Sequence, residues 1–157
     1  MYQKGDSILY PMHGAGVIES IEKREILGSI KEYYILHVPI GDMQVMIPVE
    51  SSDMVGVRPV VSREEAEAAV EILRQESTPM TGNWNKRYRG NMEKIKTGRI
   101  DQVAEIVRNL TRVDRENRLS AGEKKMLSNV RRILQSEFML VFNIDEEEAR
   151  QRIEDAI

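Results

Sequence analysis

The first 60 residues alternate short apolar and polar runs between turn residues, which is the pattern of β-strands. The runs predict five short strands, over residues 7–10, 17–22, 33–38, 44–49 and 54–57. Five strands in so short a segment are typical of a small, strongly bent barrel of the SH3 or Tudor type. Such a barrel is a binding module more often than a catalyst, and its open edge strand can accept a strand from a partner.

After residue 61 the apolar positions recur every three or four residues, which is the period of amphipathic helices. Several helix start and stop signals divide this part into five helices, which we expect to form a compact bundle. The chain is therefore predicted to be α+β, with a Tudor-like barrel over residues 1–60 and a five-helix domain over residues 61–157. The signals are the capping boxes Ser62–Glu65 and Ser120–Glu123, the caps Asp101 and Asp145, and the breakers Pro79, Gly82 and Gly98.

The charge of the chain is concentrated in one block. The 157 residues carry a net charge of −3, yet residues 82–132 contain 14 Lys and Arg against 6 Asp and Glu, a net of +8. A basic block in an otherwise acidic chain indicates a polyanionic partner, most simply nucleic acid. The alternative is that these charges are solvated faces of helices with no partner.

Trp84, the only tryptophan, stands at the start of this basic block, in the sequence GNWNKRYR (82–89). Cations of this kind bind phosphates, and an apolar side chain among them can enter between base steps in a minor groove. The alternative is that Trp84 and Tyr88, four residues apart, belong to the apolar stripe that packs a helix against its core. The sequence leaves both interpretations open.

The residues of catalysis and metal binding are scarce. The chain has no cysteine, and its only histidines, His13 and His37, have no partners at metal-ligand spacing. We therefore expect a protein that is not an enzyme and that has no catalytic or metal site, cofactor or small-molecule substrate. No apolar run approaches the ~20 residues that cross a bilayer, so we expect a cytoplasmic protein without a membrane partner.

Five segments of the chain resemble the CarD/CdnL family of bacterial transcription regulators. They occur in order along nearly the whole chain, and the joint presence of both halves is specific. A match to the first half alone is less specific, because the transcription-repair coupling factor carries a similar barrel. The segments are GDSILYPMHG (5–14), KEYYIL (31–36), GDMQVMIP (41–48), NWNKRYR (83–89) and LSAGEKKML (119–127).

The resemblance implies a promoter factor whose barrel binds the RNA polymerase β subunit, partly by strand pairing. Its helical domain would contact promoter DNA at the upstream edge of the transcription bubble with little sequence specificity. There a tryptophan in the minor groove, Trp84 by position, would keep the open complex from closing. Such a protein would associate with the nucleoid through polymerase.

The resemblance also assigns residues to both surfaces. Met46 stands where some members carry arginine, so it would offer an apolar contact instead. The alternative function is a protein-interaction module that binds polymerase or an acidic partner without touching DNA. The implied DNA contacts are Asn83, Trp84, Lys86, Arg87, Arg89, Lys124 and Lys125, and the implied polymerase contacts are Arg24, Val45, Met46 and Ile47.

Overall fold

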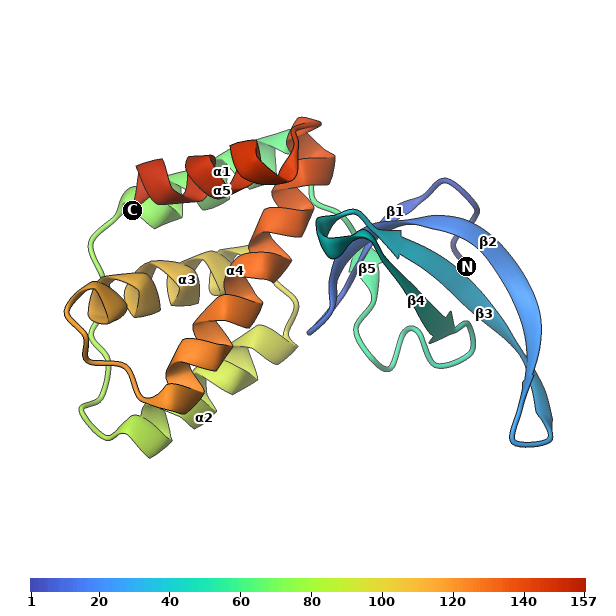
Figure 1. Cartoon of the computed structure of the whole chain (residues 1–157), viewed down its shortest axis with the longest axis horizontal. Helices are drawn as coiled ribbons and strands as arrows, with labels where there is room; N and C mark the ends of the chain where they lie inside the picture. Colours follow the sequence, from blue (N-terminus) through green and yellow to red (C-terminus); the bar gives the residue numbers. More distant parts are fainter.

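The computed structural model describes residues 1–157 and shows an N-terminal sheet followed by a helical half (Figure 1). The sheet is antiparallel, with strand order β4-β3-β2-β1-β5, and it curves without closing into a barrel. The predicted α+β class is confirmed, with the five strands forming an open sheet. The strands are β1 (Ser7–Tyr10), β2 (Gly14–Ile26), β3 (Ser29–Val38), β4 (Met43–Pro48) and β5 (Arg58–Pro59), and the 3₁₀ turn η1 (Ile40–Asp42) joins β3 to β4.

The hairpin of β2 and β3 is much longer than the sequence pattern predicts. Its two strands stay paired out to Ile26 and Ser29, around a turn formed by Leu27 and Gly28. Both turn residues have positive φ, 52° and 78°, as a two-residue turn of matching twist requires. The far part of this hairpin is exposed on both faces. Its sequence therefore lacks the alternation of apolar and polar residues from which a strand is predicted.

The strand predicted over residues 54–57 is wrong. These residues form turns, closed by backbone bonds from Val55 N to Ser51 O and from Gly56 N to Asp53 O. Met54 is 88% exposed and Gly56 has φ 80°, which an extended strand does not allow. The last strand is β5, two residues that pair with β1 just beyond this turn.

The helix start signals are confirmed at three of the four predicted caps. Ser62 and Ser120 form complete capping boxes, and Asp145 accepts a hydrogen bond from Glu148 N. Asp101 does not cap its helix, because that helix begins at Ile100 and the Asp101 carboxylate pairs with Arg99 at 2.7 Å. The helices are α1 (Arg63–Arg74), α2 (Trp84–Lys96), α3 (Ile100–Arg115), α4 (Ala121–Phe142) and α5 (Glu146–Ala156).

The long helix α4 is the centre of the helical half. It crosses from the α1–α5 pair down to α2, and its buried side chains Val130, Leu134 and Phe138 belong to one core with α1, α3 and α5 (Figure 1). Burial of these apolar side chains is what fixes the bundle. None of the five helices is long and apolar enough to span a membrane.

Helix α4 also packs against the sheet and joins the two halves. Ile133 forms a small buried cluster with Leu9 and Ala15 of the sheet. Beside it, the Ser136 hydroxyl accepts a hydrogen bond of 2.8 Å from Ala15 N. The helical half is therefore docked on the sheet through a packed, hydrogen-bonded contact.

Candidate nucleic-acid interface

The N-termini of α2 and α4 lie side by side at one end of the molecule (Figure 1). Asn83 caps α2, its side-chain oxygen accepting hydrogen bonds from Asn85 N and Lys86 N at 3.0 and 3.2 Å. Arg87 in the first turn of α2 donates two hydrogen bonds of 2.6 and 2.7 Å to Glu123 in the first turn of α4. This ion pair holds the two helix starts together.

The Arg87–Glu123 ion pair is almost completely buried, because the side chain of Glu123 is 0% exposed and that of Arg87 is 14% exposed. The hydrogen bond from Arg87 holds the pKa of the Glu123 carboxyl below its ordinary value, against the effect of burial. The same bond raises the pKa of Arg87. Both groups are therefore charged at neutral pH, and Glu123 also caps α4 through Ser120 N.

This pairing changes the interpretation of Arg87. Its guanidinium, which the sequence assigned to a phosphate, is committed to a carboxylate inside the protein. The structure makes Arg87 a residue that positions the start of α2, and its contact with DNA stays an untested prediction. The sequence did not signal this, because the partner Glu123 lies 36 residues away.

Trp84 is the first residue of α2, and its side chain is 53% exposed. Tyr88, one turn later, packs against the helical core instead. The interpretation of Trp84 as a core residue is therefore wrong, because the helix start extends beyond the core that Tyr88 contacts. Among the large hydrophobic side chains that are exposed, Trp84 is the only one in the helical half.

Most cations of the basic block already have a partner within the protein. Of its 14 cations, six are in ion pairs, Arg87 among them, while Arg108, Arg112 and Arg132 donate hydrogen bonds to the protein itself. Arg108 is only 2% exposed, and burial lowers its pKa. The count of charges in the sequence therefore overstates the number of cations that have no partner within the protein.

Five cations of the block remain free. All five are exposed and form no ion pair, and four of them are residues that the sequence assigned to DNA. The fifth, Lys96 at the far end of α2, was not among the predicted contacts. The five are Lys86, Arg89, Lys96, Lys124 and Lys125.

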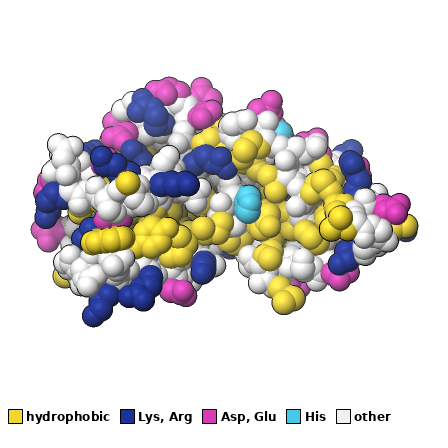
Figure 2. All heavy atoms as spheres, turned by 60° about the horizontal axis from the view of Figure 1, so that its bottom comes forward, with side chains coloured by type: hydrophobic (Ala, Val, Ile, Leu, Met, Phe, Trp, Pro, Cys, Tyr) yellow, Lys and Arg dark blue, Asp and Glu magenta, His cyan; other side chains and the backbone are white.

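Cations supply the positive charge at the paired helix starts. Asn83 and Ser120 already accept hydrogen bonds from backbone N–H groups there, and the Glu123 carboxylate lies in the first turn of α4. Lys86 belongs to the first turn of α2, and Lys124 and Lys125 follow Glu123 in α4, so both helix starts carry free cations. On the forward face in Figure 2, Lys and Arg side chains lie on either side of a hydrophobic band over the helices.

The edge strand β4 offers a second surface, on the sheet. Val49 N donates to Glu32 O of β3 at 3.0 Å. In an antiparallel pair every second residue bonds to the neighbouring strand, so the odd-numbered residues of β4 bond to β3 and the even-numbered ones face away from it. The backbone groups of Gln44 and Met46 therefore point to the open edge. The Met46 side chain is also 36% exposed.

Two of the four predicted polymerase contacts have their side chains on the inner face of the sheet. Ile47 is fully buried, and Val45 packs against the core of the sheet. Side chains alternate along a strand, so the face that exposes Met46 is opposite to that of its two neighbours. Neither Val45 nor Ile47 presents a side chain to a partner at this edge.

Arg24 lies on the same outer face as Met46. Arg24 of β2 lies opposite Lys31 of β3, and Met46 of β4 lies opposite Ile35 of β3. Lys31 and Ile35 are four residues apart on one strand, so their side chains and those of their partners point to the same face. The Arg24 side chain is 49% exposed and pairs with Glu22 at 2.7 Å. Hydrogen bonds from Ser20 and Arg24 lower the pKa of Glu22. Arg24 therefore meets solvent as part of an ion pair.

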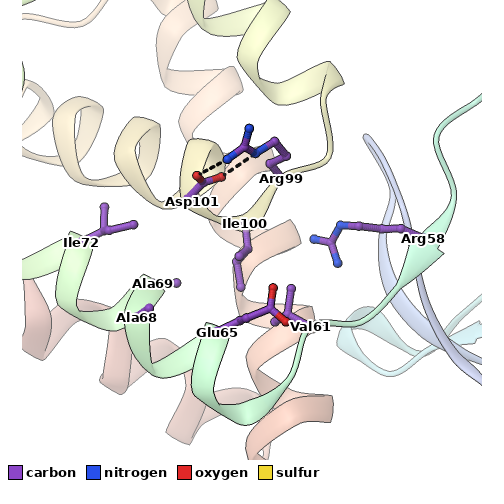
Figure 3. A pocket seen from close by; sticks show the side chains of 9 residues that line it. All are labelled: Arg58, Val61, Glu65, Ala68, Ala69, Ile72, Arg99, Ile100 and Asp101. Carbon is purple, nitrogen blue, oxygen red and sulfur yellow. Dashed lines mark hydrogen bonds and ion pairs between the residues drawn. The ribbon is translucent and has the colours of Figure 1, made fainter.

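A cleft of about 300 Å³ lies between α1 and the start of α3 (Figure 3). Its floor is apolar, formed by Ala69, Ile72 and Ile100, and its rim carries the Arg99–Asp101 ion pair. No histidine lines it. Nowhere in the molecule do three His, Asp or Glu side chains gather as metal ligands would.

Comparison with known proteins identifies the family. The model of the "CarD-like/TRCF RID domain" matches residues 2–61, and that of the "CarD, C-terminal domain" matches residues 68–154. The chain belongs to the CarD/CdnL family. A protein of Bacillus subtilis (strain 168), named "Putative transcription factor YdeB", is 40% identical over 150 residues, which cover 96% of this chain and 98% of the relative. The predicted family is thus confirmed, and it is a family of transcription-associated proteins.

Proposed function

We propose that this CarD/CdnL protein is a non-enzymatic transcription regulator that binds RNA polymerase and promoter DNA together and stabilises the open complex. The observation that carries the proposal is Trp84. It is the one large hydrophobic side chain exposed on the helical half, and it stands at two joined helix starts that carry free cations.

The helix starts supply the affinity for DNA. Lys86, Lys124 and Lys125 are exposed and unpaired, so each can neutralise a phosphate and release a counterion. Such contacts position a protein on the duplex without reading its sequence. The DNA affinity proposed here is therefore general and sensitive to salt.

Trp84 supplies the preference for an opened junction. An indole inserted in the minor groove unstacks a base step, and the cost is smallest where the duplex is already distorted. Since a ligand shifts an equilibrium only by its differential affinity, preference for the distorted junction favours the open complex over the closed one. The buried Arg87–Glu123 pair holds the first turn of α2 in place for this task.

The sheet supplies the attachment to polymerase, by our proposal to its β subunit. The open edge of β4 at Gln44 and Met46 can pair with a partner strand, and Arg24 lies on the adjoining outer face. A protein anchored in this way is held at a high local concentration over the promoter. Weak DNA contact by the helical half then suffices.

The test is the lifetime of open complexes with the Trp84→Ala variant. Loss of an exposed side chain is expected to change the free energy of unfolding by less than about 1 kcal/mol, whereas a core tryptophan costs ~3–5 kcal/mol. The variant should fold and bind polymerase but shorten the lifetime measured in a competitor-challenge assay. Trp84→Phe, which keeps an aromatic wedge, should retain most of the effect.

Two results would contradict the proposal. A stable Trp84→Ala variant with an unchanged lifetime would show that the indole does not act on the bubble. Polymerase binding without any salt-sensitive DNA binding would favour the alternative, an interaction module whose cations meet an acidic partner.

A further inference from the structure

A hollow of about 370 Å³ lies where the sheet meets the far end of α2. The rings of Tyr10 and His13 are stacked there, with centroids 4.3 Å apart and planes inclined by 16°. His13 is exposed, so a ligand can reach its side chain from solvent. The lining contains a lysine and no carboxylate, and consists of Tyr10, Pro11, Met12, His13, Met54, Val55 and Lys96.

Helix α2 runs from Trp84, its first residue, to Lys96 at this hollow. At 100° per residue, Arg89, Met92 and Lys96 fall on one flank of the helix together with Glu93, and Trp84 lies about 80° or more around the helix from them. Arg89 and Lys96 are two of the five free cations, and Met92 is partly exposed between them. The 13 residues of α2 span about 20 Å. Figure 2 shows hydrophobic side chains running across the forward face from the helical half to the sheet half.

We propose that this flank and the hollow bind the single strand that leaves a DNA fork at Trp84. In this inference, which rests on the proposed function, Arg89 and Lys96 bind phosphates and an unpaired base stacks on the ring of His13. Aromatic side chains beside cations are the general means of holding single strands. About 20 Å corresponds to about six stacked nucleotides, and to fewer in an extended strand.

The charge of the hollow favours nucleic acid over a protein segment as the occupant. Lys96 lines it and no carboxylate does. The flank also carries the exposed carboxylate of Glu93, and with Arg89 and Lys96 its net charge is +1. The phosphates of a nucleic acid would pair with Lys96 and Arg89, and the stacked rings would receive the base that Trp84 separates from its partner. A phosphate and a base are both needed to use all these groups.

The experiment compares forked DNA that carries a single-stranded flap with blunt duplex, using the full chain. The fluorescent base 2-aminopurine is placed at the third to sixth flap nucleotide. Wild type should quench it by stacking, and His13→Ala should restore the fluorescence and weaken flap binding about fivefold or more. Lys96→Ala should weaken flap binding, and neither change should affect blunt duplex. Lys4→Ala, which removes an exposed unpaired lysine elsewhere, is the control.

The outcomes separate this inference from the proposed function. If Trp84→Ala weakens DNA binding while the His13 and Lys96 variants bind flap DNA like wild type, the inference falls and the proposed function stands. If none of the three variants alters DNA binding, both fail. If the His13 and Lys96 variants lose affinity for polymerase and keep that for flap DNA, the hollow is a protein contact and the inference is overturned.

Discussion

Arg58 of the sheet and Glu137 of α4 form a two-pronged ion pair, with distances of 2.8 and 2.9 Å. Glu137 is 2% exposed and also accepts a hydrogen bond from Val61 N, while Arg58 Nε donates to Gly98 O. Four segments thus meet at one pair of side chains. The pair helps to fix how the edge of β4, the proposed polymerase contact, is oriented relative to Trp84.

The first prediction concerns this joint. Glu137→Ala leaves the Arg58 guanidinium without its carboxylate and is expected to lower the free energy of unfolding by about 3 kcal/mol, the low end for a buried pair because Arg58 is partly exposed. At a temperature where the variant is folded, it should bind polymerase yet stabilise open complexes less. Chemical denaturation and the challenge assay measure the two effects. Glu19→Ala, an exposed unpaired control, should alter neither.

The second prediction concerns the edge of β4. Met46→Pro removes a backbone N–H that points out of the sheet, so the internal ladder stays intact while a partner strand is deprived of a donor. Affinity for polymerase should fall about tenfold, and Met46→Ala, which keeps the N–H, should bind more tightly than the proline variant. Binding is measured with purified polymerase. Equal affinity of the two folded variants would exclude strand pairing at this position.

The third prediction concerns Glu123. Glu123→Gln removes a charge from the pair with Arg87 and should cost about 2 kcal/mol at pH 7, as expected for a hydrogen bond to a charged group. Because folding lowers the pKa of Glu123, its contribution is complete above the ordinary value of about 4.3 and declines as the pH falls below it. Denaturation at pH 7 and pH 3 should therefore show the difference between wild type and variant shrinking in acid. Glu116→Gln, in an exposed pair, is the control.

The fourth prediction separates free cations from the paired one. Replacing Lys86 and Arg89 by alanine should reduce the slope of log affinity against log salt by about one for each phosphate that the variant no longer binds, with little change in stability. Arg87→Ala should instead destabilise the fold, because it leaves Glu123 buried without a partner. A double variant with an unchanged slope would remove these two residues from the DNA contact.

Local signals in the sequence were sufficient for much of the fold. Ser62, Ser120 and Asp145 each act on backbone groups three residues away, so their caps can be read from the sequence and are confirmed. The strands that have one buried face can also be predicted, because apolar and polar residues alternate along them. The far part of the β2–β3 hairpin has no buried face, and no periodicity could reveal it.

Contacts between distant residues were beyond the sequence. The four-residue spacing of Trp84 and Tyr88 suits a core stripe equally well, and only the place where the core ends leaves Trp84 exposed. Likewise a count of charges cannot show that Arg87 is paired with Glu123 or that Arg108 is buried. Only the folded chain brings Lys96 beside the Tyr10–His13 stack.

Helix α4 has one further consequence. It begins beside Trp84's helix and contacts the sheet at Ile133, Ser136 and Glu137, so about 18 to 24 Å of rigid helix separates its start from that contact. In the proposed function this rigid helix sets the distance between the sheet, which binds polymerase, and Trp84, which enters the DNA. The protein would then engage the same step of the duplex, counted from the enzyme, at every promoter. Base sequence would decide how easily that step opens, and the helix would decide which step it is.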